Sequence, residues 1–169
     1  ISKNNTACRP IFSDAASAIL VSKSKKNKIG PFELGADGSG ADALQLPTGT
    51  DEIIMNGAKV LTFAMEVVPN NVNKFLKRIK IKKKRIDKFI FHQASKYILD
   101  NINRRLSIEK SKTFENYGKV GNTISASIPI ALKDACTRSK ISTNNNIIIA
   151  GYGVGLSWGS ALIKWNKIL

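Results

Sequence analysis

Apolar side chains recur at two different periods along this chain, and the two periods predict alternating helices and strands. From Asn56 to about Lys80 the apolar residues return at helical spacing, and Pro69 is expected to interrupt or kink that helix. Two more helices are predicted over residues 95–106 and 123–138, each with one apolar face.

Short apolar runs predict the strands. Residues 85–92 and 146–151 predict two buried strands, and residues 156–165 predict a last strand that pairs back after a tight glycine-rich turn at 151–155.

The N-terminal part predicts a hairpin. Residues 10–22 are expected to form a buried strand and residues 29–34 a second strand that pairs with it. Gly35–Gly40 is expected to be a flexible loop and is the best candidate boundary in the chain. Alternating strands and helices, closed by a hairpin, predict an α/β layered domain.

Length and cysteine content limit the possible domain organisation and cellular location of the protein. A chain of 169 residues can form one domain with a sizeable core, and it contains no apolar run long enough to span a membrane. The first residues lack both a signal-peptide core and an initiating methionine, so we expect a longer reading frame. Cys8 and Cys136 are too few for a disulfide framework and have no metal-ligand spacing, which favours the cytoplasm and no bound metal.

The formal net charge is +15 and is uneven along the chain, because residues 74–88 carry nine basic residues against one acidic residue, Asp87. Three interpretations remain open: a solvated helix end, an acidic protein partner, or nucleic acid. Nucleic acid is the less favoured partner because the sequence contains no nucleic-acid motif and the part of the cluster from Lys77 to Lys88 has no interleaved aromatic residue. The basic residues are Lys74, Lys77, Arg78, Lys80, Lys82, Lys83, Lys84, Arg85 and Lys88.

Two polar residues are candidates for chemistry. His92, the only histidine, ends an apolar run, and Asn122 lies in a glycine-flanked turn before a helix rich in small residues. Taken singly, His92 is equally well explained as a structural histidine, and Asn122 as a helix N-cap. Together they can donate two hydrogen bonds to one carbonyl oxygen, which would stabilise an enolate. The turn at 151–155 either directs backbone N–H groups at an oxyanion or is only a hairpin bend.

Five motifs, in order, resemble the C-terminal half of β-ketoacyl-acyl carrier protein synthase III, a condensing enzyme with the thiolase fold. The resemblance implies an α-β-α type layered fold in which residues 1–40 are the last strands of an N-terminal half-domain and residues 41–169 are the C-terminal half-domain. The motifs are IFSDAASA at 11–18, LGADGSG at 34–40, HQAS at 92–95, YGKVGNTISASIPIAL at 117–132, and a glycine-rich turn that runs into LSWGSALIKW at 156–165.

The resemblance also implies an activity. In that family a cysteine takes the acyl group from acyl-CoA, and histidine and asparagine bind the thioester carbonyl of malonyl-ACP. Decarboxylation gives an enolate that attacks the acyl-enzyme in a Claisen condensation of fatty acid biosynthesis. By motif, His92 and Asn122 would be the catalytic pair and the backbone N–H of Val154 part of an oxyanion hole. No cofactor is implied beyond the substrates acyl-CoA and malonyl-ACP.

Acyl carrier proteins are strongly acidic, so the resemblance also suggests a partner for the basic residues. Lys96, Arg104 and Arg105 occupy the helix that docks the carrier in that family, and the cluster from Lys77 to Arg85 either adds long-range steering or is only solvated surface. The complete enzyme is expected to be a homodimer.

The sequence departs from the family at several places. The nucleophilic cysteine of the family lies further upstream, and neither Cys8 nor Cys136 matches its motif, so the chain alone is expected to be inactive. Ser95 and Val154 replace the usual asparagine and glycine. These changes leave open a condensing enzyme of a specialised polyketide or surface-lipid pathway. The alternative hypothesis from another functional class is a non-catalytic basic binding module.

Overall fold

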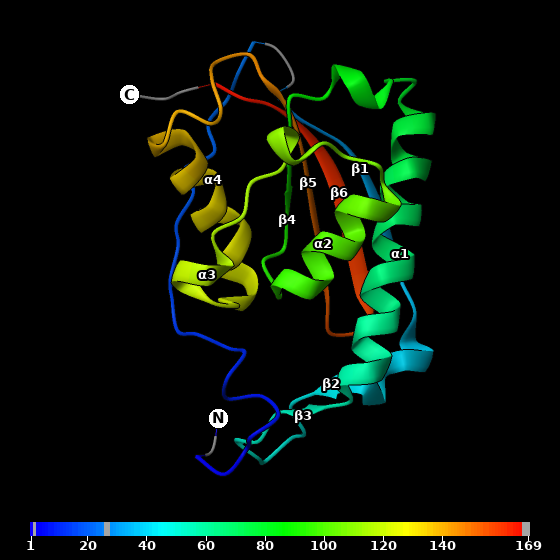
Figure 1. The fold of residues 1–169 in the computed structure, drawn as a ribbon, viewed down its shortest axis with the longest axis vertical. Coiled ribbons are helices and arrows are strands. Elements are labelled where there is room, and N and C mark those ends of the chain that lie inside the picture. The colour runs from blue at the N-terminus through cyan, green and yellow to red at the C-terminus, as the bar shows by residue number, and fades with distance from the viewer. Residues whose placement is uncertain (2, 26–27, 167–169) are drawn as a thin grey trace.

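The computed structural model describes residues 1, 3–25 and 28–166, and its centre is a four-stranded mixed sheet in the order β1-β6-β5-β4 (Figure 1). Strands β4 and β5 are parallel, whereas β5 with β6 and β6 with β1 are antiparallel. The strands are β1 (Ile29–Ala36), β4 (Lys88–Phe91), β5 (Asn146–Gly153) and β6 (Ser157–Lys164), and a separate small sheet pairs β2 (Leu44–Gln45) with β3 (Ile54–Met55).

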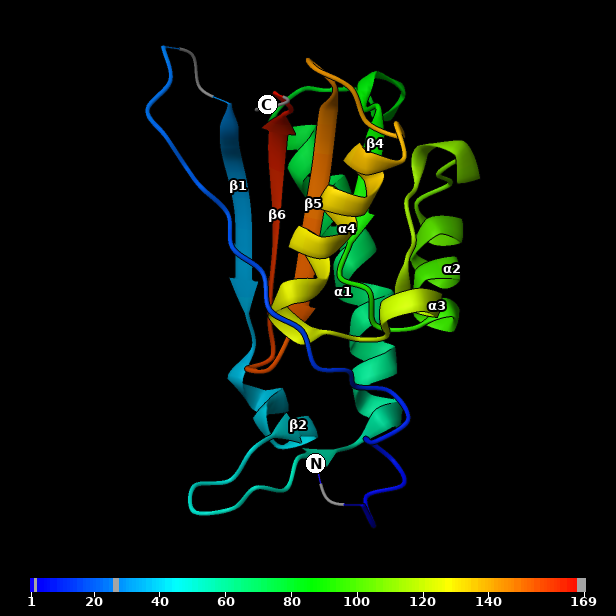
Figure 2. The ribbon, with the colours of Figure 1, turned by 90° about the vertical axis from the view of Figure 1, so that its left-hand side faces the viewer.

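Helices cover both faces of the central sheet, with α1 and α2 on one side and α4 on the other (Figures 1 and 2). Asn56 and Ser95 cap α1 and α2, because their side chains accept hydrogen bonds from Lys59 N and Ile98 N. The helices are α1 (Gly57–Arg78), α2 (Lys96–Arg105), α3 (Tyr117–Val120) and α4 (Ser127–Thr137), with 3-10 turns η1 (Gly38–Ala43), η2 (Lys83–Arg85), η3 (Lys110–Lys112) and η4 (Ile124–Ala126). No helix in the described ranges is both long and apolar enough to cross a membrane.

The alternation of side chains along β4 explains why the sheet has two cores. Phe89 and Phe91 pack toward α1 and α2, whereas Ile90 between them packs toward α4. In β5, Ile148 joins the first core and Ile147 the second. The predicted buried strands are therefore confirmed, each with one apolar core on either face.

The three long helices were predicted where they occur, with two differences in detail. Helix α1 continues through Pro69, which is buried, so the predicted interruption is wrong. Packing of α1 against α2, β1, β5 and β6 holds the helix where Pro69 lacks a backbone donor. The helix predicted from residue 123 begins as η4, and regular α4 starts only at Ser127.

The N-terminal hairpin was predicted wrongly. Residues 14–22 are exposed and form no strand, and β1 pairs instead with β6. Pro31 has no N–H to offer to a second ladder, and the many small side chains at 14–18 bury little apolar area, so pairing there gains little.

Two predicted turns are also shifted. The expected flexible loop at Gly35–Gly40 is the end of β1 followed by η1, where Asp37 accepts a hydrogen bond from Ser39 N at 3.0 Å. The expected glycine turn at 151–155 starts later, because β5 continues to Gly153. Asp37 and Leu156 exchange two backbone hydrogen bonds, of 2.8 and 2.9 Å, which join the two turns.

Candidate active site

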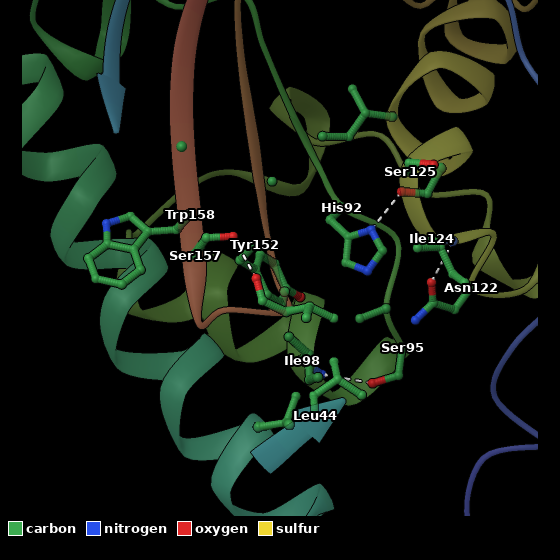
Figure 3. A pocket seen from close by; sticks show the side chains of 18 of the residues that line it. Leu44, His92, Ser95, Ile98, Asn122, Ile124, Ser125, Tyr152, Ser157 and Trp158 are labelled. Carbon is green, nitrogen blue, oxygen red and sulfur yellow. Dashed lines mark hydrogen bonds between the residues drawn. The ribbon is translucent and has the colours of Figure 1, made fainter. Parts of the chain in front are cut away.

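His92 is placed by the end of β4. Its backbone N–H donates to Ala150 O at 2.9 Å and extends the parallel ladder with β5 by one residue. The next residue, Gln93, is fully buried; its amide donates to Phe91 O at 2.7 Å and accepts from Asn116 N at 3.0 Å. These contacts hold the backbone after β4, so that the imidazole of His92 emerges at the carboxyl edge of the strand (Figure 3).

Asn122 is placed by a segment far away in the sequence. Its backbone N–H donates to Ile11 O at 3.2 Å, and its carbonyl accepts from Ser13 N at 2.9 Å. Gly121 before it has φ +68°, and a Cβ there would lie 2.0 Å from Ser13 Oγ. Only glycine fits this backbone conformation and this close approach, which explains the glycine of the GNT motif.

The amide of Asn122 has a defined orientation. Its Oδ1 accepts a hydrogen bond from Ile124 N at 2.9 Å, which leaves Nδ2 to face the cavity. Figure 3 shows this nitrogen pointing toward the side on which His92 lies. Asn122 is buried and is not the N-cap of α4, which is Ala126, but its Oδ1 satisfies the N–H of Ile124, the first residue of η4, so the side chain has a structural contact as well as a nitrogen that faces the cavity.

His92 and Asn122 line one cavity of about 770 Å³. The structure thus brings together the two residues that the sequence singled out, 30 positions apart in the chain. Most of the cavity wall is apolar, which lowers the local dielectric and strengthens any hydrogen bond made there. The apolar lining includes Phe32, Leu34, Leu44, Met55, Val60, Leu61, Ile98 and Trp158.

The imidazole of His92 is held on two sides. Its Nδ1 lies 2.7 Å from Ser127 Oγ, and the ring of Tyr152 meets it edge-on with centroids 5.2 Å apart. Burial lowers the pKa of His92 to about 4, and a hydrogen bond with the backbone of Ile124 offsets part of this effect. His92 is therefore neutral at pH 7 and can offer one ring N–H without carrying charge.

The hydroxyl of Tyr152 is buried without a hydrogen-bond partner among the described residues, and burial raises its pKa. Tyr152→Phe removes this unsatisfied group, so we expect the free energy of unfolding to rise by about 1 kcal/mol. Urea denaturation measures the change, and Tyr97→Phe, at an exposed tyrosine of α2, is the matched control. A loss of stability in Tyr152→Phe would mean that the hydroxyl has a partner in the protein.

The remaining predicted residues lie at different distances from this cavity. Val154 lines it from the turn between β5 and β6 and is 60% exposed. Lys96 starts α2 and forms an exposed ion pair with Asp100 at 2.7 Å. Arg104 and Arg105 are exposed at the other end of α2, about 12–14 Å from Lys96 along the helix, and do not line the cavity.

The basic cluster lies mostly away from the site. Residues 83–85 form η2, ahead of the first residue of β4, whereas His92 follows the last. Lys83 Nζ donates to Leu106 O, so the cluster adjoins the C-terminal end of α2 and its arginine pair. The charges from η2 to the end of α2 therefore form one basic region separate from the cavity.

Neither cysteine of the chain lines the cavity. Cys8 is buried, with Sγ 3.8 Å from Ile53 O, and Cys136 is half-buried on α4 against the second core. Neither thiol lies at a helix N-terminus, the setting typical of a reactive cysteine. The described residues thus place donors for an oxyanion in the cavity but no thiol nucleophile.

Sequence reasoning missed one residue of the site. Ser127 was not predicted as a site residue, yet its hydroxyl contacts His92 and lies 3.4 Å from Gln93 N. Its only signal in the sequence is its place in the SASIP motif, one residue after Ala126 and at the first position of α4. The contact depends on β4 and α4 meeting in space, which no local pattern encodes.

The sheet and its covering helices are those of the thiolase-like class. A crystal structure of 3-oxoacyl-(acyl carrier protein) synthase III from Pseudomonas aeruginosa PAO1 matches with a TM-score of 0.82 and 28% identity, over 88% of this chain and 48% of that one. The α/β layered fold predicted from the sequence is confirmed.

The family follows from a second comparison. The sequence model of the 3-oxoacyl-[acyl-carrier-protein (ACP)] synthase III C-terminal family matches residues 76–165, more than half of the chain. The chain therefore belongs to this family.

Curated relatives agree with that assignment. β-Ketoacyl-[acyl-carrier-protein] synthase III of Oceanobacillus iheyensis is 37% identical over 97% of this chain, and the protein of the same name from Natranaerobius thermophilus is 39% identical over 92%. The aligned part is 52% and 53% of these two relatives, so the chain spans about half their length.

Proposed function

We propose that this chain supplies the decarboxylating half of the active site of a β-ketoacyl-ACP synthase III. The observation that supports the proposal is the convergence of His92 and Asn122 in one apolar cavity, with the amide nitrogen of Asn122 free to donate. Neutral donors suit an oxyanion that forms only during the reaction, because they stabilise it more than the uncharged ground state.

In this proposal Ser127 determines which ring nitrogen of His92 carries the proton. Its Oγ is an acceptor for Gln93 N–H, and its own hydrogen is free to point to Nδ1 of the neutral imidazole. With Nδ1 as the acceptor, Nε2 carries the proton, and on substrate binding it would exchange the backbone of Ile124 for the substrate oxygen in the cavity. Ser127 is thus a positioning residue, whereas His92 and Asn122 act on the substrate.

The chemistry then runs through the malonyl thioester. The bond between its α-carbon and carboxylate breaks, CO₂ leaves, and the electron pair moves onto the thioester oxygen as an enolate. His92 Nε2–H and Asn122 Nδ2–H stabilise that oxygen. The enolate carbon attacks the carbonyl of the acyl group held on a cysteine. The oxyanion that forms there accepts a hydrogen bond from the backbone N–H of Val154. When this intermediate collapses, the cysteine thiolate leaves. No cofactor takes part in these steps.

The complete gene product that contains this chain tests the proposal. Incubated with acyl-CoA and malonyl-ACP, it should release CO₂ and form β-ketoacyl-ACP, whereas residues 1–169 alone should not. Absence of product with every acyl-CoA and with both malonyl-ACP and malonyl-CoA would overturn the proposal. Malonyl-CoA as the better acceptor would instead indicate a specialised pathway.

The carrier protein is the proposed partner of the exposed basic residues of α2. Lys96, Arg104 and Arg105 are exposed, and the two arginines have no carboxylate partner among the ion pairs of the described residues. Their basic region extends to Lys83 in η2. An acidic carrier would be attracted to this surface over the range of the Debye length.

Reversal of the arginine pair tests this docking surface. We expect Arg104→Glu with Arg105→Glu to raise KM for carrier-borne substrate about tenfold at low salt and to weaken its salt dependence, because attraction becomes repulsion. Lys23→Glu with Lys25→Glu, on the exposed segment before β1, makes the same change in charge as a control. An unchanged KM, or an equal increase in the control, would contradict docking at α2.

We also infer the setting of the complete protein. It would be a cytoplasmic homodimer that binds acyl-CoA, and the boundary between its half-domains would lie near residue 40. Strand β1 precedes that boundary and nevertheless pairs with β6, which follows it, so the two parts share one sheet.

A further inference from the structure

A second cavity, of about 300 Å³, lies at the other end of β4 from His92. Lys88, the first residue of β4, Lys110 of η3 and Lys140, which follows α4, converge on it from three separate segments. Four residue steps separate Lys88 from His92, about 13 Å along an extended strand. None of the three lysines lines the larger cavity, so this is a different site.

The three ammonium groups are not neutralised within the described part of the chain. None of them forms an ion pair with a carboxylate there. Lys88 Nζ donates only to Ser111 O, a neutral carbonyl. Burial, and after it the charge of Lys140, lower the pKa of Lys88, so these two like charges oppose each other near the cavity.

Among the described residues one carboxylate lines the cavity, and one negative charge cannot offset three positive ones. Glu115 lines the cavity, yet its Oε1 accepts a hydrogen bond from Asn103 of α2 at 3.1 Å. Burial, and after it the charge of Asp100, raise the pKa of Glu115, whereas the charges of Lys96 and Lys110 lower it, so Glu115 offsets part of the charge of Lys110. The positive charge of the three lysines therefore exceeds what this side chain can offset.

We propose that this second cavity binds a phosphate group through Lys88, Lys110 and Lys140. A phosphate carries nearly two negative charges and several acceptor oxygens, so it can engage three ammonium groups at once, whereas a carboxylate neutralises only one. Lysine suits this ligand as a compact charge with several N–H donors. Arg138 is engaged elsewhere, over the ring of Phe114 at 5.6 Å and against Asp134.

The phosphate can come from a free phosphate ion or from a lipid headgroup, and two binding arms separate these sources. In the first, isothermal titration calorimetry measures inorganic phosphate and pyrophosphate binding to the complete gene product at low ionic strength. In the second, sedimentation measures binding to phosphatidylcholine vesicles with and without phosphatidic acid.

The test variant is Lys110→Gln with Lys140→Gln, because Lys88 also holds the backbone of Ser111 and its loss could perturb folding. We expect the double variant to weaken phosphate affinity about tenfold or more, because it removes two of the three positive charges that would contact the ligand. Lys23→Gln with Lys25→Gln is the control for net charge and should bind like the wild type.

The proposal is decided by comparing the binding of the test variant with that of the wild type and the control. Phosphate binding that only the test variant loses supports the site, and loss of vesicle binding alongside it assigns the source to a lipid headgroup. No binding of phosphate or vesicles, or equal binding by the test variant and the wild type, overturns it. These results do not depend on condensing activity, so the proposed function can fail or hold separately.

Discussion

Replacing His92 with alanine is expected to lower the condensation rate of the complete enzyme by about 10²–10³-fold, the usual cost of losing one oxyanion donor. Asn122→Ala should have a similar effect, because Nδ2 faces the same cavity. The double variant should lower the condensation rate by much less than the product of the two single losses, because both groups donate to one oxygen. Steady-state formation of β-ketoacyl-ACP measures all three.

A second measurement separates this role from general damage to the site. Transfer of the acyl group from acyl-CoA to the enzyme's cysteine should persist in His92→Ala and Asn122→Ala, because the pair acts on the malonyl thioester. Asn73→Ala, at an exposed position of α1, should leave both steps unchanged. If condensation survived in both site variants, the assignment of the catalytic pair would be wrong.

The protein is expected to lose roughly 3 kcal/mol of stability through His92 as the pH falls from 6.5 to 4. In the folded chain the pKa of this group is lowered from 6.5 to about 4, chiefly by burial. Between these values the unfolded chain binds a proton that the folded chain does not, so acid favours unfolding. The contribution is present in full above pH 6.5 and is lost as the pH falls toward the folded pKa.

Urea denaturation of the wild type and of His92→Gln across this range measures the effect. Glutamine keeps a polar side chain and cannot titrate, and His92 is the only histidine of the chain, so the difference between the two curves isolates one group. The difference should change by most of the stated amount between pH 6.5 and 4. Parallel curves would show that the folded pKa of His92 is close to its ordinary value.

Local patterns in the sequence predicted most of the secondary structure and both candidate donors of the site. Ile86 and the apolar run Phe89–Phe91 predicted a buried strand, and Phe89 and Ile90 do pack into opposite cores. The helices predicted near Asn56 and Ser95 begin at those two residues because their side chains cap the first free N–H groups. These features depend on residues a few positions apart, so the sequence by itself is enough to predict them.

Only the tertiary structure decided which segments meet. The sequence could not show that β1 pairs with β6 and not with residues 10–22, that Ile11 and Ser13 hold Asn122, or that Ser127 contacts His92. Each of these contacts joins residues far apart in sequence, and packing against the whole fold selects it. By itself, therefore, the sequence identified His92 and Asn122 as candidate donors, whereas the fold determined how each is oriented and what surrounds it.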